Sequence, residues 1–197
     1  MRVLATRILY ITQKQVKRNI MDARLRKELE AGGVVPLRRV EEIKNAAAKA
    51  HADKFFRDTL FRRACADMGR ESAEAAWILT HLPNTDNNAI DEYRLQLTET
   101  AMSTMNVSLR RLTLALLERL QWNEQDIRSD FLDFCFERML NNDETYGVRA
   151  LCIKIAYAQC RHYVELREEL RISLSLIEPE TIGSGLKHCR NKTLQQL

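Results

Sequence analysis

Glycine and proline are scarce in this chain of 197 residues, which contains six glycines and three prolines. Both residue types interrupt helices and occur at turns, so their scarcity disfavours a protein of many short strands joined by tight turns. Alanine, leucine, arginine and glutamate are abundant instead, and they favour helices of three or more turns. The composition therefore predicts an all-α protein.

Long apolar runs are also lacking. Apolar runs such as residues 114–117 are far shorter than the ~20 residues that a helix needs to cross a bilayer. Residues 1–21 contain five basic and no acidic residues, a pattern that organelle presequences share with basic helices of mature proteins. Because the segment is not rich in serine, we favour a basic helix that is retained. We expect a cytoplasmic protein without a membrane partner.

Histidine occurs only four times, and no histidine has a serine, cysteine or carboxylate in an arrangement that predicts catalysis. We therefore expect no enzyme, no catalytic residues and no cofactor. The cysteines form an odd set within or beside apolar helical patterns, which is typical of reduced thiols in a cytosolic protein. A metal site would use Cys160, His162, His188 and Cys189, but neither pair has the two-residue gap of a zinc knuckle, and we expect no metal.

One amphipathic helix pattern occurs three times, at Ser72–Leu82, Ser108–Leu120 and Gly147–Gln159. Glu74 aligns with Arg110 and Arg149, at steps of 36 and 39 residues. A period of this size indicates stacked pairs of helices. The first helix of each pair is here called A and the second B.

The B helices are expected at Ala89–Met102, Asp126–Leu140 and Tyr163–Ile177. A shift of 75 residues aligns Phe56 with Phe131 and Phe61 with Phe136, which adds Asp53–Ala66 as a B helix with Leu37–Ala52 as its A partner. Phe55 is expected to widen the apolar stripe of that helix, and Trp77 to lie in the core. We predict a single domain over residues 1–197, with a basic N-terminal helix and turn (1–36), about four helical pairs (37–178) and a capping helix (179–197).

The turn before the third A helix, Asn142-Asp143-Glu144-Thr145-Tyr146-Gly147-Val148-Arg149, resembles the signature of HEAT repeats. This resemblance to HEAT-like (armadillo-type) repeat proteins implies an α-α superhelix, a right-handed solenoid. It also implies that Asp143, Arg110 and Arg149 are structural residues in a ladder along the stack. Such a fold is a scaffold that does not by itself define a function.

Two functions remain open. The first is a non-catalytic scaffold that binds a protein partner through the B-helix surface, which carries many charged side chains. Its candidate contacts are Asp91, Glu92, Arg94, Asp130, Asp133, Glu137, Arg138, Glu168 and Arg171.

The second is nucleic-acid binding, as in the DNA alkylation repair glycosylases, which are HEAT-like. Residues 1–70 have a net charge of +9 and residues 71–143 a net charge of −7, so the basic N-terminal third would contact phosphates. Its candidate residues are Lys14, Lys17, Arg18, Arg24, Arg26, Lys27, Arg38, Arg39, Arg62 and Arg63. The acidic middle of the stack argues against this second function, because carboxylates repel phosphates.

Overall fold

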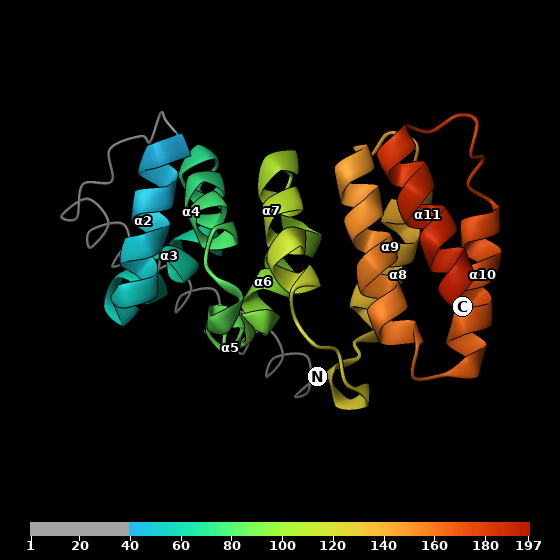
Figure 1. The fold of residues 1–197 in the computed structure, drawn as a ribbon, viewed down its shortest axis with the longest axis horizontal. Helices are drawn as coiled ribbons and strands as arrows, with labels where there is room; N and C mark the ends of the chain where they lie inside the picture. Colours follow the sequence, from blue (N-terminus) through green and yellow to red (C-terminus); the bar gives the residue numbers. More distant parts are fainter. Residues whose placement is uncertain (1–39) are drawn as a thin grey trace, which may run out of the picture. The chain divides into compact units, whose positions relative to one another are not determined.

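The computed structural model describes residues 40–197, and every regular element in this range is helical (Figure 1). Residues Arg39–Leu197 form one compact unit. The all-α prediction is confirmed for this part of the chain. The basic helix and turn expected over residues 1–36 lie outside the described residues. None of the described helices is long and apolar enough to cross a membrane.

The helices are labelled as in Figure 1. They are α2 (Val40–Ala52), α3 (Lys54–Ala64), α4 (Arg70–Thr80), α5 (Asn87–Asp91), α6 (Arg94–Ser103), α7 (Val107–Glu118), α8 (Ser129–Leu140), α9 (Tyr146–Cys160), α10 (Val164–Ser175) and α11 (Ser184–Gln196). Two short 3₁₀ helices, η1 (Asn84–Asp86) and η2 (Glu124–Asp126), lie in connectors between them.

These helices form two rows (Figure 1). In the A row, α2, α4, α7, α9 and α11 pack against one another in chain order. In the B row, α8 contacts both α6 and α10. Each B helix also packs against an A helix of its own or the next pair, as α8 does against α9. The predicted sequence of helical pairs with a closing C-terminal helix is thus present in the described residues.

Local signals set where the A helices begin. The Asn106 side chain accepts hydrogen bonds from the backbone N–H groups of Ser108 and Leu109, and Thr145 accepts one from Val148. These bonds satisfy N–H groups that have no partner within the first helical turn. Helices α7 and α9 therefore begin directly after these two caps, close to the predicted starts.

Two B helices differ from the prediction. Asp126 does not begin a helix, because its carboxylate accepts the backbone N–H of Asn123 and closes a 3₁₀ turn, so that α8 begins at Ser129. The helix predicted over Ala89–Met102 is broken between α5 and α6. At this break the Tyr93 ring stacks on Phe61, with ring centroids 4.5 Å apart.

The repeated apolar positions form the core. Two aromatic residues, however, are more exposed than the sequence predicts. Ile78, Leu114 and Ile153, which align in the repeat, are all buried. Phe55 was expected in the apolar stripe of α3, but its side chain is 76% exposed. Trp77, which was expected in the core, remains partly exposed.

Trp122 is instead the buried tryptophan. Its side chain is 1% exposed, and its ring stacks against Phe131 with centroids 5.7 Å apart. The Arg94 guanidinium lies over the Trp122 ring, 4.6 Å from its centroid. The indole N–H donates to the backbone carbonyl of Leu117 at 3.3 Å, so its polar atom is satisfied inside the core. Trp122 therefore joins the A and B rows at the connector between α7 and α8.

Polar side chains tie the turns between successive pairs together. Thr104 donates its hydroxyl to Asp67 at 2.8 Å, and Arg110 donates to the backbone carbonyl of Thr104. Arg110 also lies 3.0 Å from the carboxylate of Glu144 in the next turn. The expected carboxylate, Asp143, is exposed, so the assignment of Asp143 to the ladder is wrong by one residue.

Arg149 is buried, as the ladder requires, but it binds within its own turn. Its guanidinium donates to the backbone carbonyl of Met139 at 2.9 Å and to the side chain of Asn142 at 3.1 Å. At the opposite end of the helices, Arg119 donates to the Asn87 side chain at 2.8 Å. Both ends of the stacked helices are therefore cross-linked by hydrogen bonds.

Candidate protein-binding surface

The outward side of the B row is acidic. On α6, α8 and α10, apolar side chains such as Leu97, Phe131 and Leu170 are buried, while carboxylates are exposed. We define the B surface as these carboxylates and the exposed apolar residues between them. Its members are Leu95, Glu99, Asp130, Asp133, Glu137, Val164, Glu165, Glu168, Glu169, Ile172 and Leu176.

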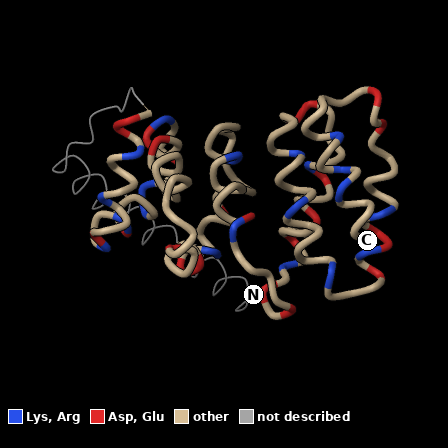
Figure 2. The backbone as a smooth tube through the Cα atoms, in the orientation of Figure 1, with Lys and Arg blue, Asp and Glu red and all other residues tan. Residues whose placement is uncertain are grey.

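The A row has the opposite charge in the same half of the stack. Helices α9 and α11 contain lysines and arginines but no aspartate or glutamate, whereas α8 and α10 contain six acidic residues against three arginines. Figure 2 shows acidic residues along α8 and α10 and basic residues along α9 and α11. This half of the unit therefore has an acidic and a basic side.

Large apolar side chains interrupt the acidic B surface. Leu95 is 54% exposed, Val164 65%, Ile172 56% and Leu176 67%. Single exposed apolar residues are common on proteins. Here Leu95 lies on α6, Val164 and Ile172 lie on α10, and Leu176 follows the end of α10; both helices contact α8. Apolar contacts surrounded by charged groups are typical of a surface that binds another protein.

Four of the predicted contact residues are exposed carboxylates of the B surface. Asp133 makes no hydrogen bond or ion pair with other described residues, and Glu137 has only Arg138 at 4.0 Å. Glu168 accepts a hydrogen bond from Arg171 at 3.2 Å, one helical turn away. Such exposed pairs are weak and easily exchanged for a partner's groups.

Asp130 is also exposed but is already paired. The Arg128 guanidinium donates two hydrogen bonds to its carboxylate, at 2.6 and 3.0 Å. These bonds lower the pKa of Asp130, so its carboxylate stays ionised in mildly acidic solution. Asp133 is therefore more available to a partner than Asp130.

Two predicted arginine contacts lie mostly inside the protein. Arg94 donates to Asp91 at 2.6 Å and to the backbone carbonyl of Gln121 at 2.7 Å, in addition to its contact with the Trp122 ring. Arg138 lies 3.7 Å from Glu144, and only a quarter of its side chain is exposed. The structure gives both residues a role in packing between helices.

Asp91 and Glu92 lie at the end of α5, before the break that precedes α6. Both are exposed, and Asp91 is held by Arg94. Glu99, Glu165 and Glu169 belong to the B surface but were not predicted as contacts. A signal for them exists in the sequence, because Glu99 lies between the buried Leu97 and Ala101 and therefore points away from them.

Most residues of the nucleic-acid hypothesis lie outside the described part of the chain. These are Lys14, Lys17, Arg18, Arg24, Arg26, Lys27, Arg38 and Arg39. Arg62 is exposed on α3. Arg63 is 6% exposed, and its guanidinium lies 2.7 Å from the Glu71 carboxylate, so Arg63 is not available to a phosphate.

The five thiols are partly or fully buried. Burial raises the pKa of Cys65 to about 11 and that of Cys160 to about 12, so both remain protonated at neutral pH and are poor nucleophiles. All five cysteines are free thiols. Within residues 40–197, no group of three or more histidines, cysteines or carboxylates is placed to hold a metal ion.

Comparison with known proteins bears on the fold. A family model described as the HEAT repeat domain matches residues 35–197. No curated protein and no solved structure matches this chain. The matched range covers all the described helices and their paired arrangement. This family forms α-α solenoids that are typically non-catalytic and generally act as scaffolds for protein interaction. The chain therefore belongs to the HEAT repeat family.

Proposed function

We propose that this protein is a non-catalytic scaffold that binds a basic protein partner on the B surface. The observation that carries this proposal is the run of exposed carboxylates on α6, α8 and α10, with Leu95, Val164, Ile172 and Leu176 exposed among them. The carboxylates would attract and orient the partner. The apolar side chains would supply most of the affinity once water is excluded from them.

The charge of the B surface favours a protein partner over nucleic acid. Asp133 and Glu165 are exposed on neighbouring helices and make no ion pair within the described part of the chain, so they would repel a phosphate backbone. Lysines and arginines of a protein partner would instead form ion pairs with them. The nucleic-acid hypothesis depends on the basic residues before α2.

Charge reversal at Asp130 and Asp133 tests the proposal. Native extract would be passed over the immobilised wild-type chain, the Asp130→Lys/Asp133→Lys variant and a control. The control, Glu124→Lys/Glu180→Lys, changes two exposed carboxylates in connectors and gives the same change in net charge. We expect the wild type and the control to retain the same partner proteins, and the Asp130→Lys/Asp133→Lys variant to lose them. Retention of the same partners by the α8 variant would reject the B surface.

A further inference from the structure

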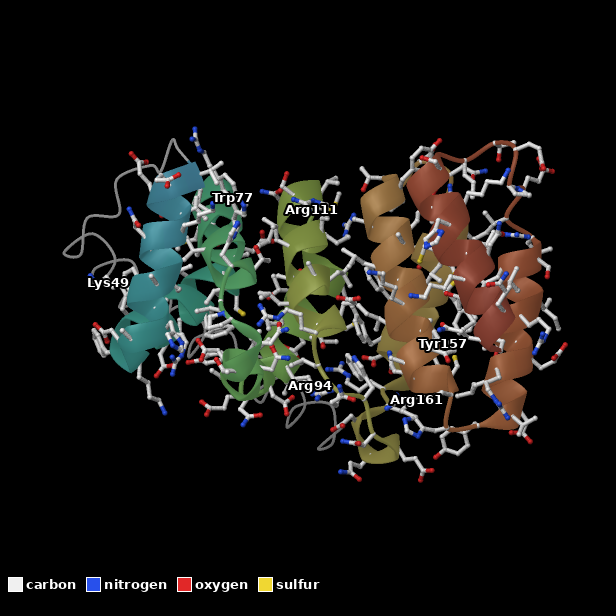
Figure 3. The ribbon with its side chains drawn as sticks, viewed as in Figure 1. Lys49, Trp77, Arg94, Arg111, Tyr157 and Arg161 are labelled. Atoms are coloured by element: carbon white, nitrogen blue, oxygen red, sulfur yellow. The ribbon has the colours of Figure 1, made fainter. Side chains whose placement is uncertain are left out.

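A groove of about 820 Å³ lies on the A row, between α7, α9 and α11. It follows the outward side of α9 from Tyr146 to Arg161, a length of ~22 Å at 1.5 Å per residue. Its walls are the C-terminal end of α7 with the connector that follows, and residues of α11 that include Leu186, Cys189 and Lys192. Figure 3 labels Tyr157 and Arg161 toward one end of α9 and Arg111 on the neighbouring α7.

Small residues on α9 give the groove its depth. Gly147, Ala150 and Ala158 line it, so only short side chains separate α9 from the groove. A Cβ atom at Gly147 would lie 3.3 Å from the Cδ atom of Arg111, so a larger residue there would displace the Arg111 side chain. Glycine fits at position 147 because the Arg111 side chain of α7 lies close to it.

The position of α11 fixes the other wall. Leu186 is buried against α9, and the Cys189 thiol lies 3.5 Å from the backbone carbonyl of Ala150. The Tyr146 ring packs on Gly183, where a Cβ atom would lie only 3.0 Å from the ring. Both contacts hold α11 beside α9, so the groove is formed before a ligand arrives.

The groove is basic. Lys154, Arg161 and Lys192 line it, and its only carboxylate is that of Glu118, which lies 3.0 Å from the Lys154 ammonium. The charges of Arg161 and Lys192 are not balanced by any carboxylate of the lining. This arrangement is the reverse of the B surface, so a partner that suits one surface would be repelled by the other.

We propose that this groove binds an acidic peptide segment of a second protein partner. Lys154 on α9 and Arg161, the residue that follows its last turn, are seven residues apart, or about 10 Å. In a peptide of polyproline II conformation, which has three residues per turn, carboxylates three residues apart lie on one side at nearly the same spacing, about 9 Å. Tyr157 offers apolar contact between these two charges, and Tyr146 offers it at the other end of the groove. The volume is in the range of about 300–1,000 Å³ of sites that bury small ligands or a few residues.

A nucleic acid is a less suitable occupant. Binding the phosphates of a nucleic-acid strand requires several lysine or arginine side chains on a continuous face. In this groove, Glu118 and apolar side chains occupy part of the lining. A short acidic peptide needs only two or three positive groups, with apolar pockets between them. The observations therefore favour the peptide, and binding of an oligonucleotide becomes an outcome of the test.

Fluorescence anisotropy tests this proposal with a labelled peptide of sequence Glu-Glu-Leu-Glu-Glu-Leu-Glu-Glu and a matched peptide with glutamine for glutamate. The full-length chain is used throughout. The groove variant is Ala158→Glu/Lys192→Glu, and the control is Lys187→Glu, which reverses an exposed charge on α11 outside the groove lining. Circular dichroism verifies that each variant is folded.

We expect the acidic peptide to bind the wild type at least about tenfold more tightly than the glutamine peptide, because the glutamine peptide has no carboxylates to pair with the lysines and arginine of the groove. The groove variant should weaken binding by at least about tenfold, whereas Lys187→Glu should change it less than about threefold. Asp130→Lys/Asp133→Lys should leave peptide affinity unchanged, which separates this site from the B surface.

Three results would overturn the proposal. The first is absence of binding, or equal affinity of the wild type and the groove variant. The second is tighter binding of an octathymidine probe than of the acidic peptide, with the same loss in the groove variant, which would make the groove a nucleic-acid site. The third is concentration-dependent self-association that the groove variant abolishes, which would show that a second copy fills the groove.

Discussion

The Arg110 guanidinium and the Glu144 carboxylate lie 3.0 Å apart, and side-chain exposure is only 8% and 5%, respectively. They come from successive helical pairs, so this ion pair joins two repeats. Buried ion pairs do not always stabilise a protein relative to apolar residues. Removal of one partner is costly, however, because the other charge stays buried without its counterion.

Glu144→Ala is therefore expected to lower the free energy of unfolding by about 3–5 kcal/mol. Arg110 and Arg138 both lose their contact with this carboxylate in the variant. Asp143→Ala, one residue away and exposed, should change stability by less than ~0.5 kcal/mol. Urea unfolding followed by circular dichroism measures both. Equal effects of the two substitutions would contradict the assignment of Glu144 to the ladder.

Trp122→Ala should destabilise the protein by about 3–5 kcal/mol, because it leaves a large cavity between Phe131 and Arg94. Trp77→Ala should cost clearly less, since Trp77 is partly exposed on α4. Thermal and urea unfolding can be compared for the two variants. A larger loss for Trp77→Ala than for Trp122→Ala would refute this description of the core.

Substitution of Arg94 and of Asp133 distinguishes a charged residue that stabilises the fold from one that contacts the partner. Arg94→Ala loses two hydrogen bonds and the contact with the Trp122 ring, and we expect a loss of about 1–3 kcal/mol in stability. Asp133→Ala should leave stability within ~0.5 kcal/mol but weaken partner binding. Unfolding and pull-down measurements on the same samples separate the two effects. If Arg94→Ala instead weakened partner binding and Asp133→Ala lowered stability, Arg94 would be the residue that contacts the partner.

Alkaline pH should destabilise the fold through Cys65, whose pKa is raised from 9.0 to about 11 by burial. Between these values the unfolded chain releases the thiol proton while the folded chain keeps it. The free energy of unfolding should therefore fall as pH rises from 9 to 11, by up to about 1.4 kcal/mol per pH unit for this group. Cys65→Ala removes this contribution, so its stability deficit relative to wild type should shrink over this range. An unchanged deficit would argue against a raised pKa of the partly buried Cys65 thiol.

Helical periodicity was sufficient to predict the paired helices, since positions such as Ile78, Leu114 and Ile153 reveal their burial by spacing alone. The ladder residue was missed because Asp143 and Glu144 are adjacent carboxylates, and only the path of the turn determines which one faces Arg110. The break at Tyr93 was missed because its cause, stacking on Phe61, joins residues 32 positions apart.

The two surfaces differ in how far the sequence predicts them. Acidic residues of α8 and α10 follow from amphipathic spacing, whereas the inward contacts of Arg94 and Arg138 depend on neighbouring repeats. The A-row groove is formed by three helices that are separate in sequence. Its lining could not be assembled without the packing of α7 and α11 against α9.

Zero-length cross-linking of carboxylates to amines in the native complex tests the central claim most directly. If a basic partner binds the B surface, its lysines should be linked to Asp133, Glu137, Glu165 or Glu169. Cross-links that come only from A-row carboxylates such as Glu118, with the B-surface residues unmodified by the partner, would contradict the account.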